Sequence, residues 1–285
     1  MHNHEDRYIL GSSEKELERL DNIQSLVFQD KTFETLRLAG IKPGMKCLDL
    51  GCGTGNVTSL MKDLVGSDGK VVGLDANPDA ISICIKKKHK DKTNTISPSP
   101  LSSIDNNIDF IIGDIYNTEL EHSSFDFIYS RLLFQHLQHP SKAIKEMKRL
   151  ASNNNNGIIC TEDIDHGLWL SYPHDLHLEK LRKCLVRLLE LSGSDPYIAR
   201  KIYKIFLQND LKPTGDSYSV CIPMSTCPHN MMGVSMAETL KDKILSNKLI
   251  SYEDFDIMLH GLKEYSNNSQ DGLVTIMGFR VWSNC

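Results

Sequence analysis

The feature that most constrains the fold is an alternation of short apolar runs with helical patterns, which starts near residue 46. Five runs rich in aliphatic and aromatic residues have the length of buried strands: KCLDLG, VVGLDA, IDFIIGD, FDFIYS and IICTED. Three helical patterns lie among them: VTSLMKDLV, PDAISICIKKK and SKAIKEMKRL. Strands that alternate with helices form a parallel sheet with helices on both faces. The sequence therefore predicts an α/β protein with a doubly wound, mostly parallel sheet.

Further helical patterns flank this alternation on both sides. Apolar residues recur at three- and four-residue steps over 13–28, which predicts an amphipathic helix. After residue 166 the pattern predicts helices and strands in turn: helices at 176–191, 196–209, 230–246 and 252–264, and strands at 216–223 and 272–285. No linker separates a second domain. We expect one domain over 1–285, with a helical cap (1–30), a cofactor-binding core (31–165), and lid helices with sheet-completing strands (166–285).

Composition and charge limit what the chain can bind. The 285 residues include 40% hydrophobic and 24% charged residues, an ordinary globular balance, and the formal net charge is −5. An acidic chain is a poor match for nucleic acid or an anionic membrane. No apolar run approaches the roughly 18 residues of a membrane span, and the start lacks the apolar stretch of a signal peptide. We expect a cytoplasmic monomer or homodimer that binds small molecules, with no nucleic-acid or membrane partner.

A glycine-rich loop follows the first predicted strand. Gly51, Gly53 and Gly55 form the pattern GxGxG, and Asp49 lies two residues before the first glycine. Glycines at the carboxyl end of a strand let a ligand approach the backbone closely. A nicotinamide-binding loop reads GxGxxG and holds a pyrophosphate, which Asp49 would repel. The loop therefore favours a ligand that carries an ammonium group.

The segment DLGCGTG, residues 49–55, resembles the first motif of class I S-adenosylmethionine-dependent methyltransferases. Asp75 ends the second predicted strand, where that family binds both ribose hydroxyls, and Asp114 and Ile115 match its adenine-binding positions after the third strand. The resemblance covers residues 40–165 and implies a Rossmann-like, seven-stranded methyltransferase fold with S-adenosylmethionine as cofactor. The cofactor-binding residues that it implies are Asp49, Gly51, Cys52, Gly53, Gly55, Asp75, Ala76, Asp114, Ile115 and Ser130.

The loop after the fourth strand indicates which branch of this superfamily the chain is similar to. It reads Ser130-Arg131-Leu132-Leu133 and lacks the (Asp/Asn)-Pro-Pro-aromatic motif typical of enzymes that methylate nucleobase amines. It also has no carboxylate beside Arg131, so no metal site is expected. The stretch RLLFQHLQHP is similar to the small-molecule branch, which includes quinone-biosynthesis and secondary-metabolite enzymes. The resemblance implies methyl transfer to an O, N or C atom of a small-molecule acceptor.

Candidate catalytic and acceptor residues lie in the loops after the fourth and fifth strands. Methyl transfer is an in-line displacement that depends on alignment, and a base helps when the acceptor is a hydroxyl or a protonated amine. We expect His136 as that base, with Arg131 binding an anionic group of the acceptor or pairing with an acid such as Asp163. The candidate catalytic residues are His136, Arg131 and Asp163, and the candidate acceptor-binding residues are Tyr8, Arg131, His166 and Tyr172.

Other interpretations of the sequence stay open. Methylation of protein or RNA, or cofactor binding without catalysis, would use the same core. Cys47, Cys52 and Cys160 would form a thiophilic site if the chain were an arsenic-methylating enzyme, although the eight cysteines are scattered and suit reduced core positions. The polar stretch 91–107 predicts a surface loop whose role is open.

Overall fold

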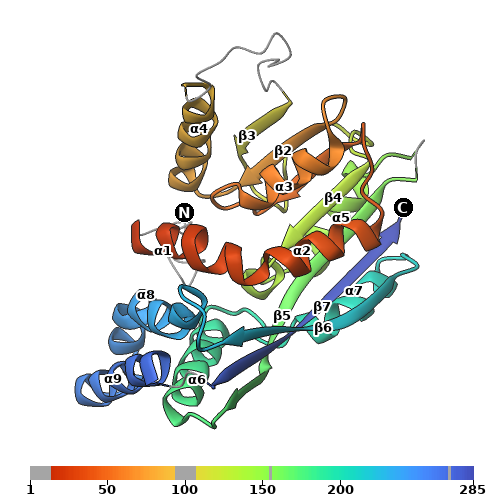
Figure 1. The fold of residues 1–285 in the computed structure, drawn as a ribbon. Coiled ribbons are helices and arrows are strands. Elements are labelled where there is room, and N and C mark those ends of the chain that lie inside the picture. The colour runs from red at the N-terminus through yellow and green to blue at the C-terminus, as the bar shows by residue number, and fades with distance from the viewer. Residues whose placement is uncertain (1–13, 94–106, 154–155, 269–270) are drawn as a thin grey trace.

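The computed structural model describes residues 14–93, 107–153, 156–268 and 271–285, and its centre is one seven-stranded sheet (Figure 1). The strand order is β3-β2-β1-β4-β5-β7-β6. The strands are β1 (Lys46–Leu50), β2 (Lys70–Asp75), β3 (Ile108–Ile112), β4 (Phe127–Arg131), β5 (Ile158–Tyr172), β6 (Thr214–Pro223) and β7 (Leu273–Asn284). The first five run parallel, whereas β7 pairs antiparallel with β5 and β6. The predicted fold class is confirmed, and the closing strand does rejoin the sheet.

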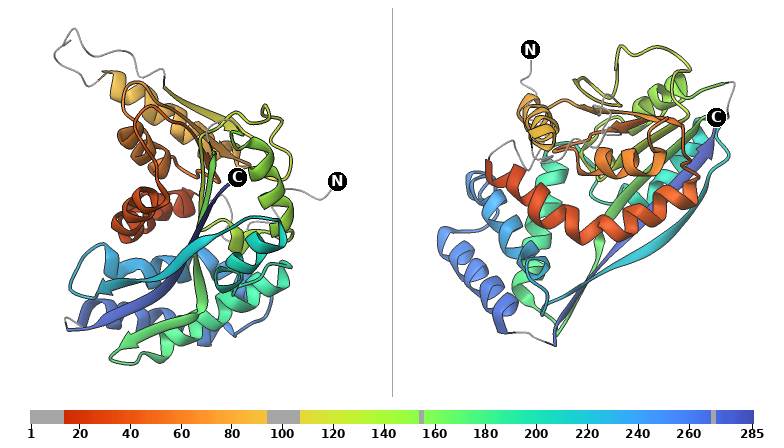
Figure 2. Two further views of the ribbon diagram at one scale, coloured as in Figure 1. Left: turned by 90° about the vertical axis from the view of Figure 1, so that its right-hand side faces the viewer. Right: turned by 45° about the horizontal axis from the view of Figure 1, so that its top comes forward.

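Helices cover both faces of the parallel part, because successive residues of each strand point to opposite faces. On one face, α2 (Ser25–Ala39) and α3 (Asn56–Val65) pack against Cys47, Phe127 and Tyr129. On the other, α5 (Pro140–Leu150) and α7 (Ile202–Gln208) pack against Leu48 and Ile128. Figure 2 shows these two helical layers on either side of the strands. The remaining helix of the alternation, α4 (Pro78–Thr93), contacts β2 and β3.

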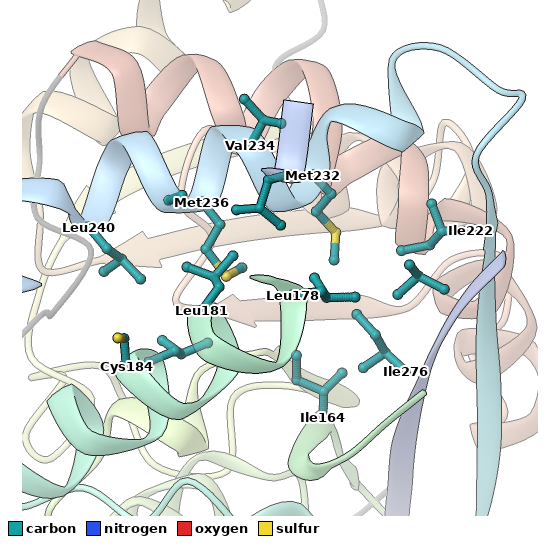
Figure 3. Close-up of a cluster of buried hydrophobic side chains, with 14 of the residues drawn as sticks. Ile164, Leu178, Leu181, Cys184, Ile222, Met232, Val234, Met236, Leu240 and Ile276 are labelled. Atoms are coloured by element: carbon teal, nitrogen blue, oxygen red, sulfur yellow. The ribbon is translucent and has the colours of Figure 1, made fainter. Parts of the chain in front are cut away.

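The long strand β5 carries the sheet beyond this core. Its pairing with β7 shifts register between Ile164 and Trp169, and the second half of β5 continues with β7 and β6 (Figure 1). Three helices lie at this extension: α6 (Leu176–Leu191), α8 (Met232–Ser246) and α9 (Tyr252–Asn268). α6 contacts β5, and α8 and α9 contact α6 and each other. Leu178, Met232 and Ile276 belong to the apolar cluster that they share, shown in Figure 3. The helices expected after residue 166 are present, and they have a hydrophobic core of their own.

The N-terminal helix is longer than the sequence predicts. It consists of α1 (Glu14–Arg19), a π-helical turn (Leu20–Gln24) and α2, and it ends at Gly40 in the left-handed conformation. The predicted helix stops at residue 28 because the next buried positions include two threonines, Thr32 and Thr35, which interrupt the apolar pattern. Within the described ranges, no helix combines the length and the apolar character that crossing a membrane requires.

Candidate cofactor and acceptor site

A cavity of about 510 Å³ lies over the carboxyl ends of the parallel strands. This is where open α/β sheets bind their ligands. The lining comes from the glycine loop, the loops after β2, β3 and β4, the start of α5 and the N-terminal helix: Leu17, Leu20, Gln24, Gly51, Gly53, 74–80, 113–116, 131–133, 136–139 and Lys142. Segments far apart in the sequence therefore build one site.

The glycine loop folds back onto β2 and forms the floor of the cavity. Gly51 N and Cys52 N both donate hydrogen bonds to Leu74 O, at 2.8 and 3.0 Å. Gly51 has a φ of +73°, and a Cβ atom there would lie 2.9 Å from Leu133 Cδ1. The tight turn and the close approach of the next loop therefore both require glycine at this position.

Asp75 borders the cavity and is held by two backbone amides. Gly53 N donates to Asp75 Oδ2 and Asn77 N donates to Asp75 Oδ1, each at 2.8 Å. Burial raises the pKa of Asp75, and these two hydrogen bonds act in the opposite direction. Each carboxylate oxygen has a second lone pair available. The side chain can therefore accept hydrogen bonds from two neighbouring hydroxyls, and Ala76 lines the cavity beside it.

The loop after β3 supplies a second polar group and an apolar wall. Tyr116 N donates to Asp114 Oδ1 at 2.9 Å, which fixes the carboxylate at the edge of the cavity. Ile115 is buried and lines the cavity next to it. An acceptor oxygen beside a flat apolar surface suits a purine ring with an exocyclic amine.

Four of the predicted cofactor residues are absent from the cavity lining: Asp49, Cys52, Gly55 and Ser130. Asp49 is 1% exposed, and Thr58 Oγ1 donates to it at 2.7 Å from α3. Burial raises the pKa of Asp49 to about 6, while Thr58 and Arg131 act to lower it. The carboxylate thus lies beneath the loop and ties it to the start of α3.

Arg131 lines the cavity at the end of β4 and takes part in a buried hydrogen-bond chain. Its Nη1 donates to Thr32 Oγ1 at 3.0 Å, and Thr32 Oγ1 donates to Glu162 Oε1 at 3.2 Å. Tyr129 and Tyr218 donate to the same Glu162 carboxylate at 2.9 and 2.7 Å. The sequence leaves Arg131 either to bind an anionic group of the acceptor or to pair with an acid such as Asp163. The structure links Arg131 to Glu162 through Thr32. Only the three-dimensional packing of α2 on the sheet reveals Thr32 as a partner.

His136 is the other predicted catalytic residue that lines the cavity. Burial, with smaller contributions from the charges of His166 and Arg19, lowers the pKa of His136 to about 3. The imidazole is therefore neutral at physiological pH.

Asp163 and His166 are buried behind that surface and are connected by Gln135. Gln135 N donates to Asp163 Oδ2 at 3.2 Å, and Gln135 Oε1 lies 2.5 Å from His166 Nε2. Burial raises the pKa of Asp163 to about 7 and lowers that of His166 to about 4. Neither side chain lines the cavity. They support the loop that carries His136.

Tyr172, another predicted acceptor residue, does not line the cavity. Tyr172 is 72% exposed on the sheet extension, where its carbonyl accepts a hydrogen bond from Tyr265 at 3.1 Å. Tyr8 lies outside the described residues. The sequence also predicts lid helices after residue 166, but α6, α8 and α9 contribute no lining residue.

The N-terminal helix is the part of the cap that reaches the site. Leu17, Leu20 and Gln24 line the cavity, and Leu20 Cδ1 lies 3.8 Å from the position of a Cβ on Gly53. Asp21 Oδ1 accepts a hydrogen bond from Thr54 Oγ1 at 2.6 Å, in the glycine loop. No sequence motif marks Asp21, so sequence reasoning missed it.

The cysteines of the predicted thiophilic alternative lie in two different surroundings. Cys52 interacts with Cys84, and both sulfur atoms contact Gly53 O. Cys47 and Cys160 lie in the hydrophobic core below. In the parts of the chain that the structure describes, no three His, Cys, Asp or Glu side chains are arranged to hold a metal ion.

Comparison with known proteins gives the same family as the sequence motifs. The family model described as "Methyltransferase domain" matches residues 41–204, more than half of the chain. An uncharacterised methyltransferase of Schizosaccharomyces pombe is 26% identical over 172 residues, which cover 60% of this chain and 58% of that protein. The demethylmenaquinone methyltransferase of Staphylococcus aureus is 29% identical over 150 residues, which cover 52% and 56%. The chain thus spans little more than half the length of these relatives.

A solved structure gives the same fold. The S-adenosylmethionine-dependent methyltransferase of Aquifex aeolicus superposes with a TM-score of 0.52 at 20% identity, covering 71% of this chain and 90% of that one. At this identity the likeness concerns the fold alone. The predicted Rossmann-like methyltransferase sheet is confirmed.

Proposed function

Because the chain belongs to the S-adenosylmethionine-dependent methyltransferases, we propose that it transfers the cofactor's methyl group to an O, N or C atom of a small molecule. The observation that carries this proposal is the continuity of one cavity. Asp75, Asp114, Arg131, His136 and the N-terminal helix all line this one cavity. A single cavity of this kind can hold a methyl donor and an acceptor in contact.

The residues present fit the cofactor. Asp75 would accept both ribose hydroxyls, and Asp114 with Ile115 would hold the adenine ring. When bound, S-adenosylmethionine supplies an electrophilic methyl group on its sulfonium. The protein's part is to align the two reactants and keep water out, which can lower the barrier by several kcal/mol.

The acceptor end of the cavity favours a molecule with an apolar body. Leu17, Leu20, Leu132 and Leu137 line the cavity as apolar walls, and His136 lines it as a polar group. A neutral imidazole can accept a hydrogen bond from an acceptor hydroxyl or donate one to a carbonyl. The relatives named demethylmenaquinone methyltransferase are compatible with such an acceptor.

We infer that the N-terminal helix closes the acceptor end. It contributes three lining residues, and its π-helical turn interrupts the helix beside the cavity. Short π-helical segments are common at functional sites in helices. The net charge of −5 supports a small-molecule acceptor over nucleic acid or an anionic membrane. We propose a cytoplasmic location and a monomer or homodimer.

Ligand binding and product identification together test this function. S-adenosylhomocysteine should raise the melting temperature of the protein and NAD should not, as expected for a ligand of the native state. Incubation with methyl-labelled S-adenosylmethionine and a metabolite extract should then label a small molecule. An Asp75→Ala variant provides the matched control, because a product of this site should disappear with it. Stabilisation by NAD alone, or label that appears only in protein or RNA, would contradict the proposal.

A further inference from the structure

One residue in the wall of the cavity has a strained backbone. Leu132 directly follows β4, and its φ is +53°, in the left-handed region. The cost of this region for a residue with a Cβ atom corresponds to a factor of about 5 to 30 in its population. A leucine keeps such a conformation only where its surroundings fix it, and residues of this kind cluster at functional sites. Neighbouring groups must therefore hold Leu132.

The bend at Leu132 places the following side chains over the glycine loop. Leu132 and Leu133 both line the cavity, and a Cβ atom on Gly51 would lie 2.9 Å from Leu133 Cδ1. The chain then forms a 3₁₀ turn over Phe134–His136, in which His136 N donates to Leu133 O at 2.9 Å. The conformation of one strained residue thus sets where these lining side chains lie.

Both backbone polar groups of Leu132 have buried partners. Leu132 N donates to Glu162 O at 2.8 Å, and Gln135 Nε2 donates to Leu132 O at 3.1 Å. The two groups belong to the planar peptide units on either side of the Leu132 Cα, so the two hydrogen bonds together fix its φ and ψ. The bond to Glu162 is a backbone bond beside the β4–β5 pairing, whereas the other bond depends on the side chain of Gln135.

Gln135 is itself held at both ends of its amide and at its backbone. Leu132 O can only accept, so the amide nitrogen faces it and the amide oxygen faces His166. Gln135 Oε1 lies 2.5 Å from His166 Nε2, which therefore carries the proton. Gln135 N donates to Asp163 Oδ2 at 3.2 Å. The side chain is 6% exposed and does not line the cavity, so Gln135 acts on the cavity only through the loop.

We propose that Gln135 is a positioning residue, which keeps the strained bend at Leu132 and thereby holds the loop 131–137 in the shape that binds the cofactor. Asp163 and His166 act through Gln135 by fixing it. The inference rests on the proposed function, since it takes S-adenosylmethionine as the ligand of the cavity. Without the Gln135 amide the unliganded loop relaxes towards negative φ, and ligand binding must then restore the strained form.

Removing the Gln135 amide should weaken cofactor binding. Gln135→Met keeps the length of the side chain and removes both of its hydrogen bonds. The affinity for S-adenosylhomocysteine, measured by titration calorimetry, should fall about 5- to 30-fold, the factor by which the strain favours the relaxed loop. Gln208→Met, at an exposed position on α7, is the matched control and should keep the wild-type affinity.

A glycine at position 132 separates positioning from general stabilisation. Glycine adopts positive φ about as readily as negative φ, so in Leu132→Gly the bend persists without the Gln135 amide. Adding Gln135→Met to Leu132→Gly should therefore lower the affinity no more than about threefold below that of Leu132→Gly alone. A merely structural role of Gln135 predicts the same fold-loss in both backgrounds.

The outcomes separate this inference from the proposed function. If Gln135→Met binds S-adenosylhomocysteine as tightly as the wild type, or if its loss of affinity is unchanged in the Leu132→Gly background, the inference is overturned. Melting temperatures show whether each variant is folded. If Gln135→Met does not fold, Gln135→Glu takes its place, because it keeps an oxygen for His166 and lacks the N–H for Leu132 O. If the wild type does not bind S-adenosylhomocysteine, the proposed function itself fails.

Discussion

Asp21 Oδ1 accepts a hydrogen bond from Lys87 Nζ at 2.6 Å, and this ion pair joins the N-terminal helix to α4 across the glycine loop. The same oxygen accepts from Thr54 at 2.6 Å and from Asn56 at 2.9 Å, and Lys87 also donates to Thr54 O. Partial burial alone would raise the pKa of Asp21, but the hydrogen bonds from Lys87 and Thr54 lower it below its usual value. One carboxylate thus fastens the cap to the loop that would hold the cofactor.

Removing the Asp21 carboxylate should weaken cofactor binding. Asp21→Ala removes three hydrogen bonds while leaving the cavity lining intact, so affinity for S-adenosylhomocysteine should fall about three- to tenfold. Amide hydrogen exchange over residues 14–24 should speed up in the same variant. Lys31→Ala, which breaks the exposed ion pair with Glu34 on α2, is the control and should change neither quantity. Unchanged affinity in Asp21→Ala would show that the cap does not restrain the cofactor.

Much of the fold could be predicted because its signals are local. The strand patterns and the GxGxG loop each depend on a few neighbouring residues, and the structure contains β1 and β2 where these patterns predict strands. Asp75 and Asp114 could be placed at the cavity because a residue that follows a parallel strand lies at the ligand-binding edge whatever the rest of the chain does.

The remaining site contacts depend on long-range packing that sequence periodicity does not record. Thr32 meets Glu162 across 130 residues, and Asp21 meets Lys87 across 66. Tyr172 has the chemistry of an acceptor-binding residue, but the length of β5 carries it away from the cavity. Residue type alone could not show that Thr32 and Asp21 make long-range contacts and that Tyr172 lies away from the cavity. Polar side chains in loops and helices are usually solvated.

Removing the predicted ribose acceptor should weaken the cofactor selectively. Asp75→Ala should cost about 1.5–3 kcal/mol of binding free energy for S-adenosylhomocysteine, the range for hydrogen bonds to a charged group. Part of the loss should come from the loop, since Gly53 N loses its acceptor. Asp79→Ala, at an exposed position on the same cavity edge, is the control. Calorimetry that finds equal affinities in Asp75→Ala and the wild type would place the ribose elsewhere.

Gly51 should be intolerant of any side chain. Gly51→Ala combines a left-handed backbone with a contact of 2.9 Å to Leu133, so it should lose cofactor binding as well as stability. Gly44→Ala has a φ of +81° with nothing within 4 Å of the new Cβ, and should therefore cost only the backbone strain, about 1–2 kcal/mol of unfolding free energy. Chemical denaturation and S-adenosylhomocysteine titration of both variants would separate strain from clash. Retained binding in Gly51→Ala would contradict the close approach of the two loops.

Asp163 should make the protein less stable as pH rises. Burial raises its pKa to about 7 in the folded state, whereas an unfolded aspartate has a pKa of about 3.9. The folded state therefore holds the extra proton between these values, and its contribution to stability, full below about pH 4, is lost as pH approaches 7. Asp163→Asn removes this titration, so the wild type should lose about 2–3 kcal/mol relative to the variant between pH 5 and pH 8. If urea denaturation gives the wild type and Asp163→Asn parallel profiles of unfolding free energy against pH, this prediction is contradicted.

His166 should make the protein less stable as pH falls. A variant that lacks the imidazole should therefore lose less unfolding free energy in acid. Burial lowers the pKa of His166 to about 4, below the unfolded value of about 6.5. Its contribution to stability is therefore present above about pH 6.5 and is lost as pH falls towards 4, because the unfolded state then binds the proton. His166→Gln keeps a polar atom near Gln135 and removes the titration, so it should reduce the stability loss between pH 7 and pH 5 by on the order of 1 kcal/mol. His260→Gln, on the exposed face of α9, is the matched control and should reproduce the wild-type profile. If urea denaturation gives His166→Gln the same acid sensitivity as this control, the buried imidazole is not the group that titrates.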